Sequence, residues 1–137
     1  MEDEVARAGL EARATFPAPA DDFVEQVFCH GLTEQGASHV SASIVNPGFA
    51  QTDGIGLTVS WDPRQLPRMW QWRMLGPGMY LTGMEPANCG ILGRAEEREM
   101  GSLQSLAPGE KRAFDVTIRV GLGPEVGALI ESSAGVA

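Results

Sequence analysis

A short stretch near the middle of the chain alternates its residues with a period of two, and this pattern limits the fold more than any other feature. Trp70, Trp72 and Met74 fall on one side of an extended backbone. Gln71 and Arg73 fall on the opposite side. Successive side chains point to opposite faces only in a β-strand, so the stretch predicts a strand.

A turn and a returning strand follow this stretch. Gly76-Pro77-Gly78 is a turn signal, and residues 79–85 alternate again up to the acid Glu85. Pro86 has no backbone N–H, so we expect the strand pairing to weaken directly after Glu85. The two strands should therefore form an antiparallel hairpin that carries an acid at its end.

Other segments of the same kind lie on both sides of this hairpin. They are residues 23–30, 38–46, 55–61 and 114–120. Turn residues separate them, which predicts an all-β fold and favours an antiparallel β-sandwich. We expect residues 1–22 to be loosely ordered, residues 23–124 to form the sandwich and residues 125–137 to form a tail with a short helix. A further helical turn is expected at residues 95–98.

Composition excludes several classes of partner. The net charge is −8 and the pI is about 4.6, which argues against nucleic acid because a phosphate backbone needs a basic surface. The same charge argues against anionic membranes. No apolar run has the length of a transmembrane helix, and the N-terminus is acidic where a secretory signal would be basic. We therefore expect a cytoplasmic protein without nucleic-acid or membrane partners.

Cysteine and histidine content predicts neither a metal site nor a cofactor. Cys29 and Cys89 lack the spacing of a zinc ligand pair, and both are expected to be ordinary thiols. His30 and His39 are isolated from each other and from any acid with metal-ligand spacing. No glycine-rich phosphate loop or nucleophile motif is present either.

The acid at the end of the hairpin has the chemical surroundings of a sugar site. Aromatic rings cover the apolar face of a pyranose, amides bond its hydroxyls, and a carboxylate takes a proton from one of them. Glu85 is the candidate base, while Trp70 and Trp72 compete with Gln71 as binding residues because the two sets lie on opposite faces. The alternative interpretation is a solvated Glu85 and a tryptophan pair in the core.

Two polar residues after the hairpin are further binding candidates. Asn88 and Arg94 follow Glu85 on an expected loop, where binding groups are common. Asn88 would equally suit a cap of its own turn, and Arg94 would equally suit an ion pair with Glu96 or Glu97. The sequence leaves these alternatives open.

Four blocks of sequence carry a family resemblance. They are Trp70-Gln-Trp-Arg-Met-Leu-Gly-Pro-Gly-Met-Tyr80, Gly83-Met-Glu-Pro-Ala-Asn88, Gly93-Arg-Ala-Glu-Glu-Arg98 and Leu106-Ala-Pro-Gly-Glu110. Together they resemble the aldose 1-epimerase-like proteins of the DUF4432 family, in the galactose mutarotase-like superfamily. The resemblance runs from about residue 6 to about residue 120 and covers only the C-terminal portion of such a protein. It implies part of a large antiparallel supersandwich.

The resemblance also implies a chemistry. In such proteins a glutamate at the corresponding strand end removes the proton from the anomeric hydroxyl, and a histidine protonates the ring oxygen. Glu85 matches the glutamate position, but the family's His-x-Asn-x-Gly-x-Pro segment is absent from this chain. The chain thus resembles the half of an epimerase that carries the base without the acid.

The resulting hypothesis is binding of an aldose-type sugar without epimerase turnover by this chain alone. The alternatives are a non-catalytic carbohydrate-binding sandwich and a truncated gene product without activity. If a half is missing, strand edges and apolar residues should be exposed and the chain should self-associate. The residues expected to be exposed are Ile55, Leu57, Trp70 and Met79. The identity of the sugar stays open.

Overall fold

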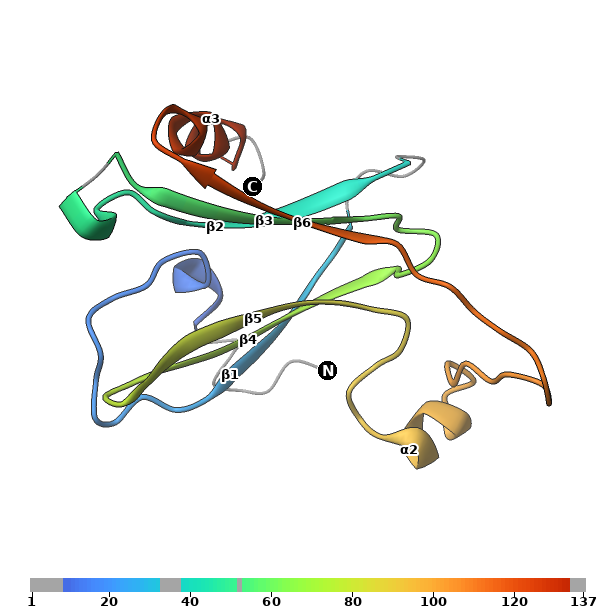
Figure 1. Ribbon diagram of the computed structural model, residues 1–137. Helices are drawn as coiled ribbons and strands as arrows, with labels where there is room; N and C mark the ends of the chain where they lie inside the picture. Colours follow the sequence, from blue (N-terminus) through green and yellow to red (C-terminus); the bar gives the residue numbers. More distant parts are fainter. Residues whose placement is uncertain (1–8, 33–37, 52, 134–137) are drawn as a thin grey trace. The chain divides into compact units, whose positions relative to one another are not determined.

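The computed structural model describes residues 9–32, 38–51 and 53–133. In this part of the chain, six strands form two three-stranded antiparallel sheets (Figure 1). The strands are β1 (Gln26–His30), β2 (Val40–Asn46), β3 (Ile55–Trp61), β4 (Arg68–Gly76), β5 (Met79–Ala87) and β6 (Val116–Leu122). The helices are η1 (Leu10–Ala12), η2 (Phe49–Gln51), α2 (Arg94–Glu99) and α3 (Pro124–Ser133). The predicted all-β, antiparallel fold is confirmed.

The chain divides into two compact units, and neither is continuous in sequence. The described residues within 1–35 and 66–112 form the first unit, which holds β1, β4, β5 and α2. Those within 36–65 and 113–137 form the second unit, which holds β2, β3, β6 and α3. No helix among the described residues is long and apolar enough to cross a membrane.

The sheet of the first unit has the strand order β1-β4-β5. Its β4–β5 hairpin is the one predicted from the sequence, with Trp70 opposite Glu85 and Trp72 opposite Gly83. Pairing continues through Pro86 to Ala87, so the predicted weakening after Glu85 is wrong. The physical reason is that β5 lies at the edge of the sheet, where a residue without an N–H is tolerated.

The N-terminal segment of the first unit is fixed on one face of β4. The Arg73 guanidinium donates to the carbonyl of Ala12 (2.8 Å), and the Gln71 amide donates to the carbonyl of Arg13 (3.0 Å). Three aromatic rings surround the same guanidinium, those of Phe16, Phe23 and Phe28. Of the expected loose segment 1–22, residues 1–8 lie outside the described residues. The remainder covers polar groups that would otherwise be buried without partners.

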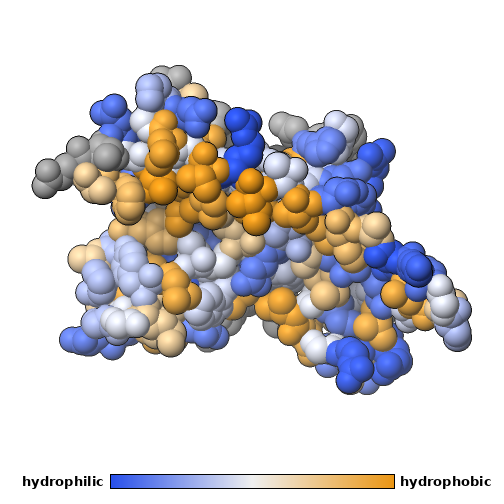
Figure 2. All heavy atoms as spheres, in the orientation of Figure 1, coloured by the Kyte–Doolittle hydropathy of each residue, from blue (hydrophilic) through white to orange (hydrophobic). Residues whose placement is uncertain are grey.

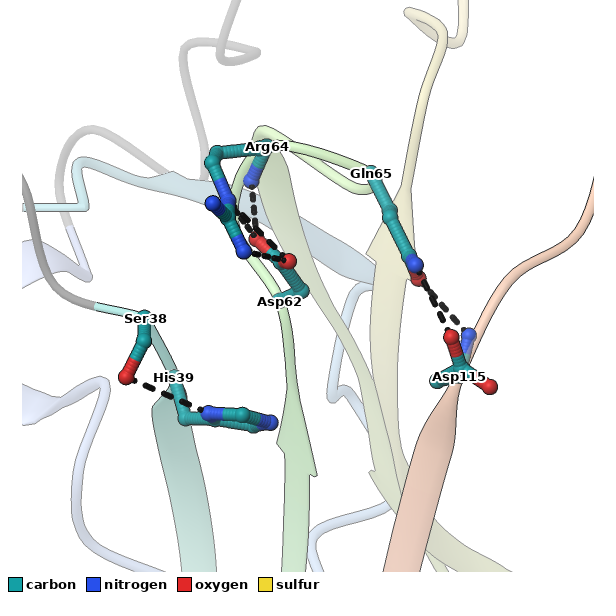
Figure 3. A network of polar contacts seen from close by, with 6 residues as sticks. All are labelled: Ser38, His39, Asp62, Arg64, Gln65 and Asp115. Carbon is teal, nitrogen blue, oxygen red and sulfur yellow. Dashed lines mark hydrogen bonds and ion pairs between the residues drawn. The ribbon is translucent and has the colours of Figure 1, made fainter.

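The sheet of the second unit has the order β2-β3-β6, and β3 has the predicted bounds. Strand β6 begins two residues later than predicted. The backbone N–H of Asp115 donates to Gln65 Oε1 (2.7 Å), and Gln65 Nε2 donates to Asp115 Oδ2 (2.9 Å; Figure 3). Because Gln65 holds Asp115, pairing with β3 starts at Val116, and it extends as far as Leu122 opposite Ile55.

Helix α3 packs on one face of this sheet, at a place where glycines leave room. A Cβ at Gly56 would lie 2.6 Å from Leu129 Cδ1, and a Cβ at Gly121 would lie 3.6 Å from the same atom. Val126 of α3 is fully buried. The helix agrees with the expected short helix in the tail, and the expected turn at 95–98 agrees with α2.

Candidate functional site

The Glu85 side chain lies over a glycine on β5. A Cβ at Gly83 would overlap the Glu85 carboxylate, so only glycine leaves room for the acid there. Gly83 is directly opposite Trp72 on β4, and directly opposed residues point to the same face. The exposed carboxylate is therefore placed beside the Trp72 side chain.

The two tryptophans of β4 share this face but differ in exposure. Trp70 is only 4% exposed, and its indole N–H donates to the carbonyl of Cys89 (3.2 Å). It packs and anchors the chain after β5, and its ring is not offered to a ligand. Trp72 is partly exposed, so it is the better stacking surface of the two.

Gln71 lies on the opposite face from Glu85 and has its own partners. It is 8% exposed, its Nε2 donates to the carbonyl of Arg13, and its Oε1 lies 2.9 Å from His30 Nε2. Both ends of the amide are thus engaged within the protein. Of these binding candidates, only the tryptophans share a face with Glu85.

Neither histidine lies beside Glu85. His30 is opposite Met69, which places it on the face of Gln71. His39 belongs to the other unit, and its Nδ1 lies 3.4 Å from Ser38 Oγ (Figure 3). In the described strands of the first unit, the face of Glu85 therefore carries no imidazole.

The loop after β5 is held by a buried acid that no sequence pattern indicates. Glu97 of α2 is 4% exposed and accepts a hydrogen bond from Ser102 Oγ (2.5 Å). That bond, the backbone N–H groups of Gly90 and Leu92 and the charge of Arg68 lower the pKa of Glu97, against the opposing effect of burial. Together with the Trp70–Cys89 bond, these contacts fix the loop that begins at Asn88.

The remaining predicted residues stand on this loop and on the helix after it. Asn88 directly follows β5 and is partly exposed. Arg94 is the first residue of α2 and is exposed. Of the two acids considered as partners for Arg94, Glu97 is instead held by Ser102 and by the loop backbone. Asn88 therefore lies close along the chain to Glu85, whereas nothing in the structure ties Arg94 to it.

Two further residues share the face of Glu85 and were not selected from the sequence. Arg68 is opposite Ala87 at the start of β4, two residues before Trp70. Cys29 of β1 is opposite Trp70 on its other side and is exposed. The period of two already placed Arg68 with Trp70, so that residue was within reach of the sequence pattern. Cys29 depended on the register of a distant strand.

The face defined by Cys29, Arg68, Trp70, Trp72 and Glu85 is called the Glu85 face below. It offers an exposed carboxylate, a cation and a partly exposed indole. No group of three or more metal-ligating side chains occurs among the residues that the structure describes. The groups present suit hydrogen bonding and stacking.

Comparison with known proteins identifies a family. Residues 1–120 match the model of a domain of unknown function, DUF4432. The chain has no match among curated proteins and none among solved structures. The family match includes every residue of the Glu85 face and ends within β6, so α3 lies outside it.

Proposed function

The chain belongs to the DUF4432 family, and from that premise we propose that it binds an aldose-type sugar on the Glu85 face. The observation that carries the proposal is the position of the Glu85 carboxylate over Gly83 and beside Trp72. A pyranose has one apolar C–H face and a rim of hydroxyls. An indole next to an acceptor matches both features.

The surroundings of Glu85 support a hydroxyl-rich ligand over a purely apolar one. Arg68 supplies a donor on the same face, and Asn88 supplies an amide on the loop directly after β5. The loop is anchored by Trp70 and Glu97, so Asn88 is held in place before a ligand arrives. Such preorganisation lowers the entropic cost of binding.

The resemblance to aldose 1-epimerase-like proteins of the galactose mutarotase-like superfamily suggests a chemistry for Glu85. The carboxylate would accept the proton of the anomeric hydroxyl while the C1–O5 bond breaks and its electron pair moves to O5. That oxygen must then receive a proton from an acid on the other side of the ring. The described strands of the Glu85 face supply no imidazole for this step. We therefore propose binding without accelerated mutarotation by this chain alone.

Binding is tested by NMR titration of the chain with a panel of aldoses. The expected result is a saturable shift of the Trp72 indole N–H signal, with little shift of the Trp70 signal. Glu85→Gln keeps the size of the side chain, so it should weaken binding modestly, whereas Glu85→Ala should weaken it by about tenfold, as expected for a lost charged hydrogen bond. Trp72→Ala should weaken it by a similar factor.

The matched control is Glu99→Gln, which removes the same charge from an exposed position at the end of α2. It should leave the titration unchanged. Shifts centred on Gln71 instead of Trp72, or an affinity that ignores both Glu85→Ala and Trp72→Ala, would reject the Glu85 face as the site. Mutarotation followed by polarimetry against a buffer blank should show no acceleration. An acceleration would contradict the proposal that this chain alone lacks an acid to protonate O5.

A further inference from the structure

Strand β6 forms an unpaired edge of the second unit's sheet. It pairs with β3 on one side and has no strand on its other side among the described residues. Its apolar residues form an exposed row along one face (Figure 2). Of the four positions expected from the sequence to be exposed, Met79 is exposed, Ile55 and Leu57 are partly exposed, and Trp70 is buried. The row on β6 consists of Val116 (47% exposed), Ile118 (65%), Val120 (60%) and Leu122 (59%).

The edge lacks the features that usually keep two strand edges apart. Proline, inward-pointing charges and several lysines serve this purpose in natural sheets. Strand β6 has no proline, and Arg119 is its only charged residue. Arg119 also lies on the face opposite the apolar row, so it does not interrupt that row.

The face of β6 that carries Arg119 also has an acid beside a glycine. Gly121 shares this face, and a Cβ there would lie 3.3 Å from Glu125 Oε2. Glu125 belongs to the first turn of α3 and is exposed. The carboxylate therefore stands over the end of β6, beside a position that has no side chain of its own.

We propose that β6 pairs antiparallel with β6 of a second copy of this chain, about a twofold axis at Val120. This register places Arg119 opposite Gly121 of the partner subunit. The arginine then lies next to that glycine, within reach of the partner subunit's Glu125, whose carboxylate stands over the glycine. By symmetry the pair forms twice, and the apolar rows of the two strands join on the other face.

Other registers are disfavoured by the same charges. An axis at Arg119 places the two arginines opposite each other. An axis at Ile118 places Asp115 opposite Gly121, beside the partner subunit's Glu125, which brings two acids together. An axis at Gly121 brings both Glu125 side chains together. A register shifted by one residue would place apolar residues of one strand opposite polar-face residues of the other.

The dimer should be weak and dependent on salt. The paired strands overlap over residues 118–122 only, which is small compared with a standard interface. The net charge of −8 per chain opposes association in general, so the Arg119–Glu125 pairs must offset it. We expect a monomer–dimer equilibrium that shifts towards dimer as protein concentration rises.

Sedimentation velocity over a range of protein concentrations tests the proposal. Arg119→Glu alone and Glu125→Arg alone should each weaken the dimer by at least about tenfold, the scale of a lost charge pair. An equimolar mixture of the two variants should restore association. In each heterodimer the two substituted side chains form one pair with its charges exchanged, and the unchanged Arg119 and Glu125 form the other. Arg112→Glu makes the same charge change at an exposed residue outside β6 and should have no such effect.

Variant folding is checked by circular dichroism. An arginine in the first turn of α3 is unfavourable for the helix, so Glu125→Gln serves as the milder variant and should weaken the dimer less. A chain that stays monomeric at all concentrations would overturn the proposal. So would a dimer that survives Arg119→Glu or one that the mixture fails to restore.

Discussion

Two glutamates of the first unit, Glu85 and Glu97, both lie over a glycine, yet their surroundings differ. The Glu97 carboxylate over Gly90 is buried and held by Ser102 and two backbone N–H groups. The Glu85 carboxylate over Gly83 is exposed. A buried acid whose acceptors are all engaged stabilises a structure, whereas an exposed acid beside an indole is available to a ligand. The glycine beneath each acid gives a direct way to separate the two roles.

The largest loss of stability is expected for Gly90→Ala. The added methyl group would overlap the Glu97 carboxylate, which cannot move without losing its bonds to Ser102 and to the loop. We expect the free energy of unfolding to fall by about 1–3 kcal/mol, as for other overpacked sites. Urea denaturation followed by circular dichroism measures this. Gly31→Ala is the control, because Gly31 lies outside the helices and strands and an added Cβ there has nothing within 4 Å. A Gly90→Ala variant as stable as the original chain would show that Glu97 is not held as described.

Gly83→Ala should lower sugar affinity and leave stability nearly unchanged. The added methyl group again overlaps a carboxylate, but Glu85 is exposed and can swing away at little cost. We expect stability to change by less than about 0.5 kcal/mol, while the displaced acid leaves Trp72 and sugar affinity falls. Thermal denaturation and the NMR titration together measure both quantities. A large loss of stability with unchanged affinity would reverse the assignment of the two acids.

Much of the fold could be predicted because alternation in β-strands is a local signal. It located β3 at its observed bounds and placed Trp72 and Glu85 in one hairpin. The role of Glu97 could not be predicted in this way, since it stands in a polar run that also suits a solvated helix. Its burial depends on Gly90 and Ser102, whose positions are set by tertiary contacts.

The choice between the two faces of β4 illustrates the same limit. The period of two separated Gln71 from Trp72 but did not say which face is covered. The answer lies in the carbonyl groups of Ala12 and Arg13, which accept hydrogen bonds from the β4 side chains. Backbone acceptors leave no pattern in the sequence, because every residue has a carbonyl.

A smaller effect is expected from Ser102→Ala. The Ser102 hydroxyl is the main cause that lowers the pKa of Glu97 below its ordinary value of 4.5. A pKa lowered by folding means that the unfolded chain binds more protons, so this contribution is present above pH 4.5 and is lost as the pH falls below it. The variant should raise the Glu97 pKa and make the acid-induced loss of stability shallower. Carboxyl carbon NMR titration measures the pKa, and an unchanged value would assign the shift to the backbone N–H groups.

The smallest effect concerns Asp62, an acid of the second unit whose pKa is shifted by an exposed neighbour. Its carboxylate accepts hydrogen bonds from the Arg64 side chain and backbone, with Nη2 and Oδ2 2.5 Å apart (Figure 3). These bonds lower the pKa of Asp62 to about 2, from an ordinary value of 3.8.

Arg64→Gln should therefore return the Asp62 pKa part of the way towards 3.8, because the backbone N–H of residue 64 still bonds the carboxylate. The stabilising contribution of the pair is present above pH 3.8 and is lost as the pH falls towards 2. The Arg64 side chain is 76% exposed, so its loss should leave the melting temperature at pH 7 nearly unchanged. Carbon NMR titration of Asp62 and thermal denaturation measure the two quantities. A strongly lowered melting temperature would mean that Asp62, like Glu97, stabilises the fold. A shifted pKa would then mark a structural acid in this protein even where its partner is exposed.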